Sequence, residues 1–378
     1  MTSVAIVTGD FVPTGGMDRA NYALASFLAR SGCSVELVAH RAASELLALP
    51  NTRLHRVAKP CGAYTLGQWL LAHRGRQIGE AVVKGGGRVI VNGGNCRFGD
   101  INWVHYVHAA YRPESAASWP RRLKQQLEYP LHLRNERVAL RRSKLVVCNS
   151  RRTQTDVVER VGIPRERTCV VYYGNDPKEF YPADPVARVS LRSKLGVPAA
   201  APLVVFIGAL GDRRKGFDAL HAAWETLCRD ADWDAVLLVV GVGAELDAWR
   251  RRSLTAGMGA RIRYVGFRKD VADILRAADL LVSPTRYEAY GLGVHEALCC
   301  GLPAVVSASA GVAERYPKEL RDLLLTDPND VPALASILRR WRAENEVFKH
   351  RVMPFGAELC NYTWDDMSRE LSQSLRYS

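Results

Sequence analysis

Short apolar runs rich in β-branched residues alternate with amphipathic segments along the whole chain, and this alternation is the feature that most constrains the fold. The first half begins with a predicted strand at 4–8, a predicted helix at 17–30 and a predicted strand at 34–38. A second series starts with a predicted strand at 203–207. Strands that alternate with helices in this way form parallel sheets covered by helices. We therefore expect an α/β protein with two doubly wound parallel sheets.

The rest of the chain fits this two-sheet interpretation. A proline-rich segment at 175–202 separates the halves, and we expect a linker there because proline lacks the backbone donor that helices and sheets need. The predicted domains are 1–176 and 177–360. The other predicted elements in the two series are strands at 88–91, 103–107, 144–148 and 168–173, a helix at 119–142 broken at Pro130, helices at 217–228, 244–255, 271–277 and 292–300, strands at 235–240, 262–265, 280–282 and 304–306, and a helical end at 348–377.

Composition narrows the class of protein. Hydrophobic residues make up 48% and charged residues 24% of the 378 residues, which is typical of a globular protein and excludes a disordered or coiled-coil chain. The nine cysteines include no Cys-x-x-Cys pair, which indicates free thiols in a reducing compartment. The first residues resemble a strand and no signal peptide, and no apolar run reaches the ~20 residues of a membrane span. We therefore expect a cytoplasmic protein.

The positive charge is concentrated in the first half. Residues 1–182 hold 26 basic and 14 acidic residues, whereas residues 183–378 hold 26 and 25. The segment 119–144 alone has eight basic residues against Glu128 and Glu136, with leucines interleaved. Such asymmetry favours an anionic partner, and we expect peripheral attachment to the inner face of a membrane with a lipid-linked or anionic acceptor. A small soluble acceptor with a merely solvated basic face is the alternative.

Two glycine-containing loops follow predicted strands at equivalent places in the two halves. Gly15 and Gly16 precede the first helix, where a ligand can approach the backbone closely and meet the amides of a helix N-terminus. Arg213, Arg214 and Lys215 precede a helix in the second half. The helix dipole disfavours cations at that end unless an anion binds between them, so this loop is a predicted phosphate site.

Two further segments contain titratable residues near predicted strand ends. Glu288 lies before a glycine-rich turn and Glu296 about one turn into the helix that follows, so the amides of Gly291 and Leu292 are available for a diphosphate and the carboxylates for sugar hydroxyls. In the first half, His105 and His108 both lie near a strand end. His108 is the preferred candidate because it is nearer that end, and the choice between the two stays open.

Together these segments resemble the retaining glycosyltransferases of family four, which have the GT-B fold. The most specific match begins at Ser283 and follows the family pattern Pro-Ser-x-x-x-Glu-Gly-Phe-Gly-x-x-x-x-Glu-Ala-x-x-x-Gly-x-Pro. The matching positions are Glu288, Gly291, Glu296, Ala297, Gly301 and Pro303. The Arg214–Lys215 step and the Gly15–Gly16 pair resemble the family's two ligand loops. The chain departs from the family at Ala209, where an arginine is common, and at Asn175, Ala289 and Tyr290.

The resemblance implies two Rossmann-like domains facing a central cleft, with a C-terminal helix (361–378) crossing back to the first domain. It implies transfer of a sugar from a nucleoside diphosphate sugar to an acceptor hydroxyl with retention, in cell-surface glycan or glycolipid synthesis, without a metal or resident cofactor. His108 would touch the donor sugar, Glu288 would bind that sugar, and Glu296 would bind the ribose. The diphosphate would be held by Arg214, Lys215 and the amides of Gly16, Gly291 and Leu292, and the base would lie near Gly266, Phe267 and Arg268.

Other classes fit less well. A nucleotide-sugar epimerase of the same fold is the nearest competitor. A nicotinamide-dependent oxidoreductase is disfavoured because Gly241-Val242-Gly243 lacks the third glycine and the later acidic residue of the dinucleotide fingerprint. A nucleic-acid binder would explain the basic half, but no recognised motif accompanies the charge. A sugar-binding module would need neither both glutamates nor the cationic loop.

Overall fold

The computed structural model describes residues 3–60, 64–114 and 119–374, and the chain divides into two compact units. Unit 1 comprises Met1–Arg112, Lys124–Gly174 and Thr363–Ser378, and unit 2 comprises Pro113–Leu123 and Asn175–Tyr362. The domain limits predicted from the sequence stay a prediction. Within the described residues, no helix is both long and apolar enough to cross a bilayer.

Unit 1 is built on a seven-stranded sheet in which every neighbouring pair of strands is parallel. A separate parallel pair, β2 (Asp10–Phe11) and β4 (Arg41–Ala42), lies beyond the ends of β1 and β3. The main sheet has the order β5 (Thr52–Arg56), β3 (Ser34–Ala39), β1 (Ser3–Val7), β6 (Arg88–Asn92), β7 (Ile101–Val104), β8 (Leu145–Cys148) and β9 (Thr168–Val170). Strands β7 and β9 each end three residues earlier than predicted, so His105 lies after β7 and not within it, in the same segment as His108.

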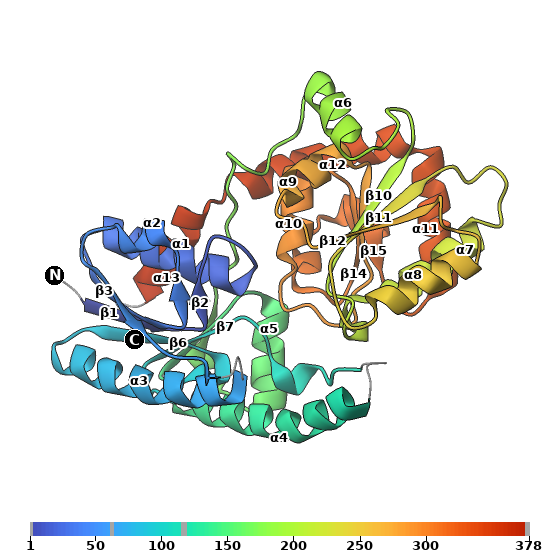
Figure 1. Cartoon of the computed structure of the whole chain (residues 1–378). Coiled ribbons are helices and arrows are strands. Elements are labelled where there is room, and N and C mark those ends of the chain that lie inside the picture. The colour runs from blue at the N-terminus through green and yellow to red at the C-terminus, as the bar shows by residue number, and fades with distance from the viewer. Residues whose placement is uncertain (1–2, 61–63, 115–118, 375–378) are drawn as a thin grey trace. The chain divides into compact units, whose positions relative to one another are not determined.

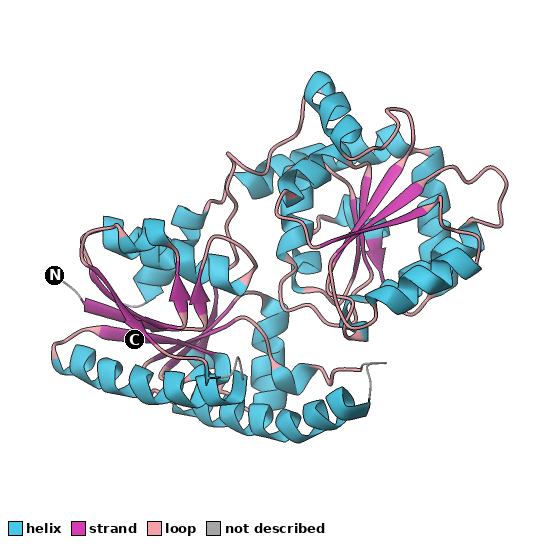
Figure 2. Cartoon of the chain, in the orientation of Figure 1, coloured by secondary structure: helices cyan, strands magenta, loops and turns pink. Residues whose placement is uncertain are grey.

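Helices cover both faces of this sheet (Figures 1 and 2). The terminal helix α13 packs along α1, and the Arg30 guanidinium of α1 contacts the Asp365 carboxylate of α13 at 2.7 Å. The helices of unit 1 are α1 (Met17–Arg30), α2 (Ser44–Leu47), α3 (Tyr64–Lys84), α4 (Trp119–Arg142, whose first turns fall in unit 2), α5 (Arg151–Asp156, continued by a π-helical turn over Val157–Val161) and α13 (Trp364–Ser374), with short 3-10 turns at Gly93–Asn95, His108–Ala110 and Arg165–Arg167.

Helix α3 was not predicted, because glycines interrupt its sequence. Gly67, Gly75 and Gly79 each cost about 1 kcal/mol of helix propensity relative to alanine. The structure shows what favours them: a Cβ at Gly75 would lie 2.8 Å from Val7 Cγ1 of β1, and one at Gly79 would lie 2.8 Å from the Phe98 ring. Glycines at this spacing let the helix approach the sheet closely, so tertiary packing outweighs local propensity.

The predicted break at Pro130 is wrong. Helix α4 runs from Trp119 to Arg142 with Pro130 inside it. Proline removes one backbone donor and strains one turn, but the 24-residue helix has many other hydrogen bonds, and its last turns pack Ala139 and Leu140 into the core.

Unit 2 has a six-stranded parallel sheet with helices on both faces (Figure 2). The strand order is β12 (Ile262–Gly266), β11 (Val236–Val240), β10 (Leu203–Ile207), β13 (Leu280–Ser283), β14 (Ala304–Ser307) and β15 (Leu324–Leu325). Its helices are α6 (Pro185–Lys194), α7 (Phe217–Leu227), α8 (Leu246–Thr255), α9 (Val271–Ala277), α10 (Leu292–Cys299), α11 (Val331–Ala343) and α12 (Asn345–Cys360), with 3-10 turns at Arg213–Lys215, Gly311–Arg315 and Lys318–Leu323.

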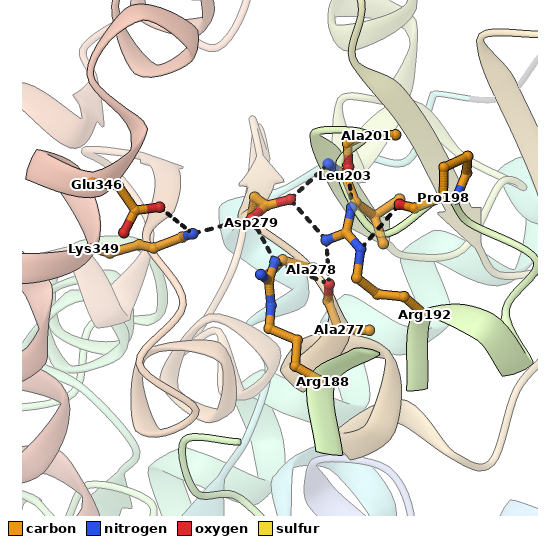
Figure 3. A network of polar contacts seen from close by, with 10 residues as sticks. All are labelled: Arg188, Arg192, Pro198, Ala201, Leu203, Ala277, Ala278, Asp279, Glu346 and Lys349. Atoms are coloured by element: carbon orange, nitrogen blue, oxygen red, sulfur yellow. Dashed lines mark hydrogen bonds and ion pairs between the residues drawn. The ribbon is translucent and has the colours of Figure 1, made fainter. Parts of the chain in front are cut away.

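The segment predicted as a linker contains helix α6. Pro185 occupies the first helical position, where a missing N–H costs nothing, and the Asp184 carboxylate caps the helix by accepting from the Ala187 amide at 2.9 Å. Helix α6 is tied to the sheet through Asp279, a buried carboxylate at the start of β13 that contacts Arg188 (2.5 Å), Arg192 (3.1 Å) and Lys349 (3.3 Å) (Figure 3). The segment is therefore part of unit 2.

The predicted terminal helix at 348–377 consists of two helices, α12 and α13. Residues 361–363 separate them, and the Asp366 carboxylate accepts from the amide and the hydroxyl of Thr363 to cap α13. Residues 375–377 of the prediction lie outside the described residues. Gly174 is required at this point of unit 1, because a Cβ there would lie 2.3 Å from the Thr363 carbonyl carbon.

Candidate active site

The cationic loop of unit 2 follows β10 and contains a single 3-10 turn, Arg213–Lys215. The Asp212 carboxylate opens the turn by accepting from the Arg214 amide at 3.3 Å. Gly216 closes it with φ of 71°, and a Cβ there would lie 1.8 Å from the Pro284 carbonyl oxygen. Only glycine combines this conformation with this approach, so the loop is held against the segment that follows β13.

Two residues after β13 fix the backbone of the cationic loop. The Arg214 carbonyl oxygen accepts from the Thr285 hydroxyl (2.9 Å) and from the Arg286 amide (2.8 Å). The Arg286 guanidinium donates to the Arg213 carbonyl oxygen (2.6 Å) and to both oxygens of Asp218 (2.7 and 2.8 Å). The bidentate Arg286 therefore connects the two loops to helix α7, and this connection restricts the positions of Arg214 and Lys215.

Glu288 lies between the two cations. Its carboxylate forms an ion pair and hydrogen bond with the Lys215 ammonium, and the Arg214 guanidinium lies 3.7 Å from the same oxygen. All three side chains are mostly buried, with 17% to 21% of each exposed. Burial alone would raise the pKa of Glu288, but the charges of Lys215 and Arg214 and the Lys215 hydrogen bond hold it below the usual value. The carboxylate is therefore ionised at neutral pH.

Helix α10 begins at Leu292, four residues after Glu288. Gly291 is its N-cap with φ of 111°, and a Cβ there would lie 2.9 Å from Val312 Cγ1. The amides of Leu292 and Gly293, in the first turn, have no acceptor within the helix. A Cβ at Gly293 would meet nothing within 4 Å, so space is open above this turn.

Glu296 lies in the second turn of α10 and is 9% exposed. Its neighbour His295 is buried, and its Nδ1 lies 2.6 Å from the Tyr290 hydroxyl oxygen. Burial and, to a smaller extent, the charge of Arg315 lower the pKa of His295 to about 3, although a hydrogen bond with the Leu359 backbone opposes this shift, so the ring is neutral. The Tyr290–His295 contact ties the glycine turn to the helix that positions Glu296.

Gly266 is the last residue of β12, two strands from β10, and Phe267 and Arg268 follow it. The Gly241 amide donates to the Gly266 carbonyl oxygen at 2.8 Å, and a Cβ at Gly241 would lie 1.9 Å from the Gly208 carbonyl oxygen. The loops after β10, β11 and β12 therefore run side by side. Phe267 is 68% exposed, and Arg268 pairs with Asp270 at 2.5 Å.

In unit 1, Gly16 is the N-cap of α1, and a Cβ at Gly15 or Gly16 would meet nothing within 4 Å. The loop is open, as an approaching ligand requires. Burial, together with the nearby Asp10 charge, raises the pKa of Asp18 in the first turn to about 6, although Arg41 opposes this shift.

The two candidate histidines of unit 1 differ in their surroundings. His105 Nδ1 lies 2.5 Å from the Tyr173 hydroxyl and its Nε2 lies 2.9 Å from Asn92 Nδ2, and burial lowers its pKa to about 3. Both ring nitrogens are thus occupied within unit 1. The His108 side chain is 38% exposed, and its Nδ1 lies 3.0 Å from the buried Glu136 carboxylate. The geometry favours His108 as the histidine that meets a ligand.

The structure brings Arg214, Lys215 and Glu288 together in unit 2, with Gly291, Leu292 and Glu296 on the helix that follows and Gly266 to Arg268 two loops away. Gly16 and His108 lie in unit 1. Sequence reasoning missed Asp212, Arg286 with its partner Asp218, and Glu136 as the carboxylate that holds His108. No local pattern marks Arg286 or Glu136, because their partners are distant in the sequence, whereas Asp212 accepts from the Arg214 amide only two residues away.

Two protein-family models match this chain. The family model described as Glycosyltransferase Family 4 matches residues 14–179, and the model described as Glycosyl transferases group 1 matches residues 201–343. The two matches cover the loops of both units in the expected order. The chain belongs to glycosyltransferase family 4.

Relatives of this family 4 chain are also glycosyltransferases. The D-inositol 3-phosphate glycosyltransferase of Xylanimonas cellulosilytica is 32% identical over 242 residues, a match that covers 61% of this chain and 54% of that enzyme. The chain spans about half the length of the curated relatives that it matches.

Solved structures show the same GT-B fold. Sucrose-phosphate synthase from Thermosynechococcus elongatus has a TM-score of 0.80 at 22% identity, covering 100% of this chain and 99% of that one. Anabaena Alr3699/HepE in complex with UDP-glucose has a TM-score of 0.70 at 18% identity, and the match covers 100% of both chains.

Proposed function

We propose that the protein transfers a glycosyl unit from a nucleoside diphosphate sugar to an acceptor hydroxyl and retains the configuration at the anomeric carbon. The observation that carries this proposal is the cluster of Arg214, Lys215 and Glu288 beside the first turn of α10. Two cations and the amides of a helix N-terminus form a site for a diphosphate, and an ionised carboxylate beside them is suited to sugar hydroxyls.

The chemistry needs charge stabilisation more than proton transfer. The bond between the anomeric carbon and the diphosphate oxygen breaks, its electron pair stays on the diphosphate, and the acceptor oxygen bonds to the anomeric carbon on the same face. The acceptor proton passes to a diphosphate oxygen. Fixed cations that meet the developing charge lower the barrier, which is the role of Lys215 and Arg214.

The ion pair with Glu288 keeps the two cations in place before the donor binds. A diphosphate would compete with Glu288 for Lys215, and the carboxylate would then turn to the sugar. Glu296 would bind the ribose, and Gly266, Phe267 and Arg268 would border the base. The proposal also assigns Gly16 to the diphosphate and His108 to the donor sugar, and it needs neither a metal ion nor a resident cofactor.

Relatives suggest the classes of substrate. The Anabaena structure holds UDP-glucose, so we propose a uridine diphosphate sugar as the donor. The Xylanimonas enzyme is named a D-inositol 3-phosphate glycosyltransferase, and this name favours a small hydroxylated acceptor here. A glycolipid or cell-surface glycan is the second candidate, and the exposed surface of unit 1 described below is what favours it.

Thermal shift with nucleotides followed by NMR of the product tests the proposal. UDP and UDP-sugars should raise the melting temperature, because a ligand that binds only the folded state stabilises it, whereas UMP should raise it less. NMR of the product should show the anomeric configuration of the donor, with equal rates in the presence of a chelator. An inverted product, or conversion of the donor sugar to its epimer without acceptor, would contradict the proposal.

A further inference from the structure

Helix α4 of unit 1 carries an exposed apolar stripe. Leu127 and Leu131 are 70% and 43% exposed, and the same four-residue spacing continues to Leu123 and Trp119, which are 45% and 66% exposed. Residues four apart lie on one face of a helix, so the leucines form a continuous ridge. A contiguous exposed apolar patch of this kind marks an interaction surface.

Helix α3 presents a matching stripe beside it. Leu66 and Trp69 are 55% and 68% exposed, and the Trp69 ring stacks with His73 one turn later. A groove of about 630 Å³ lies between the two helices and is lined by Trp69 from α3 and Leu131 from α4. The Gln68 side chain closes its floor by donating to the Gly94 carbonyl oxygen at 3.2 Å.

The groove is cationic. Arg76, Arg97 and Arg142 line it, and Glu80 is the acidic residue among its lining residues. Glu80 is half exposed and lies 3.8 Å from Arg76, so the pair is weak. Within the described part of the chain, Arg142 has no carboxylate partner. Arg97 is oriented toward α4 by a 2.7 Å hydrogen bond to Asn135.

We propose that this α3–α4 surface binds an anionic lipid bilayer, with lipid phosphates at the arginines of the groove and Trp69, Leu127 and Leu131 in the interfacial region of the bilayer. Exposed leucines beside basic residues are the combination that interfacial membrane binding needs. The residues named in this proposal belong to unit 1, and the inference does not depend on the proposed transfer reaction.

The charge and the exposed leucines of the surface argue against two other partners, a second copy of this chain and a nucleic acid. A second copy of this chain would place like-charged arginines opposite one another across a symmetric contact, which costs free energy. A nucleic acid would satisfy the arginines but would leave the exposed leucines without apolar partners. An anionic bilayer offers both phosphates and hydrocarbon.

Vesicle sedimentation with three paired variants tests the proposal. The charge variant is Arg76→Gln with Arg142→Gln, and the apolar variant is Trp69→Gln with Leu127→Gln. A matched control on the exposed face of α8 in unit 2 is Arg251→Gln with Leu254→Gln, since Leu254 is 68% exposed and Arg251 is exposed. Thermal melting of each variant checks that it is folded.

The wild-type protein should sediment with vesicles containing phosphatidylglycerol at low salt and remain in the supernatant with pure phosphatidylcholine or at high salt. A basic residue beside an anionic bilayer strengthens binding about fivefold, so the charge variant should bind about 25-fold more weakly. The control should bind as the wild type does. These measurements use no donor, so a protein without transfer activity that still sediments would refute only the proposed function.

Four results would overturn the inference. The first would be a wild-type protein that stays in the supernatant with phosphatidylglycerol vesicles at low salt. The second would be a control that loses as much binding as the groove variants. Displacement from the vesicles by inorganic phosphate at constant ionic strength would show a site for the free ion instead. A dimer in sedimentation velocity that the apolar variant abolishes would assign the surface to a second copy of the chain.

Discussion

The two units use their cations in different ways. In unit 2, single carboxylates hold several cations at once: Asp279 contacts Arg188, Arg192 and Lys349, and Glu288 contacts Arg214 and Lys215. In unit 1, the arginines of the α3–α4 groove face solvent with little acidic compensation. The comparison teaches that these basic residues of unit 2 position loops and helices inside the unit, whereas the arginines of the α3–α4 groove on unit 1 are available to an external partner.

The largest effect that tests this comparison concerns Asp279. Asp279→Asn removes the buried counter-charge of Arg188 and Arg192 and leaves Lys349 with the exposed Glu346, and such a loss typically costs ~3–5 kcal/mol. Hydrogen exchange of unit 2 amides measures the loss. Asp230→Asn is the matched control, since Asp230 is 58% exposed and pairs with Arg339 at 3.3 Å, and an exposed pair contributes ~1 kcal/mol or less. Equal effects of the two substitutions would show that burial of the network does not matter.

The same network predicts a pH dependence. Burial alone would raise the pKa of Asp279, but Arg188, the Leu203 amide, Lys349 and Arg192 lower it below the ordinary value. The unfolded state therefore binds the proton at a higher pH than the folded state. The contribution to stability is complete above the unfolded pKa of ~3.9 and is lost as the pH falls through the lower folded pKa. The difference in stability between wild type and Asp279→Asn should shrink only in that acidic range.

The second effect concerns the cationic loop. Lys215→Ala removes a cation from the place where charge develops on the leaving diphosphate, so kcat/KM should fall about a hundred- to thousandfold. Steady-state kinetics with Arg251→Ala as the control measures this. Activity near the wild-type value in a folded Lys215→Ala protein would contradict the assignment of the loop.

The sequence predicted most elements of unit 2 and the loops that hold the cluster, because strands buried on both faces and the family pattern with Glu288 and Glu296 are local. Helix α1 was predicted with its observed limits, since its apolar stripe and the following glycine are also local. Helix α3 was missed because the reason for Gly75 and Gly79 lies in β1 and in Phe98, far away in the sequence.

Parts of the candidate site could not be predicted from the sequence either, because the residues involved contact partners far away in the chain. Nothing in the sequence near Arg286 shows that it holds Asp218, 68 residues away, and nothing near His108 shows that Glu136 holds it. The ion pair between Lys215 and Glu288 joins two motifs that were assigned separately to phosphates and to sugar. Motifs predict which residues matter, whereas only the structure shows which of them share a partner.

A smaller effect separates the two glutamates of unit 2. Glu296→Gln should weaken the binding of UDP about ten- to a hundredfold, as expected for loss of a charged hydrogen bond to the ribose. Glu288→Gln should leave UDP affinity unchanged or increase it severalfold, because Lys215 loses a competing partner, while turnover falls. Calorimetry with UDP alone distinguishes the two variants, and equal losses of affinity would refute the proposed roles.

The smallest predicted effect concerns Glu136, the carboxylate that positions His108 in unit 1. The Glu136 carboxylate accepts from the amides of His108 (2.7 Å) and Ala109 (3.1 Å) and contacts the His108 ring, so one buried group sets both the backbone and the side chain of this turn. Glu136→Gln keeps the shape and removes the charge, and hydrogen bonds to charged groups contribute ~1.5–3 kcal/mol. Because Gln retains one acceptor, we expect turnover to fall about tenfold.

The binding of UDP should be unchanged in Glu136→Gln, because Arg214, Lys215 and Glu296 belong to unit 2. Glu128→Gln is the control on the same helix, since Glu128 pairs with the exposed Lys124 at 3.9 Å. A tenfold loss of turnover with unchanged UDP affinity would place His108 at the reacting sugar and not at the nucleotide. A loss of UDP affinity in Glu136→Gln would instead show that the His108 turn helps to bind the nucleotide, and the assignment of His108 to the donor sugar would then fail.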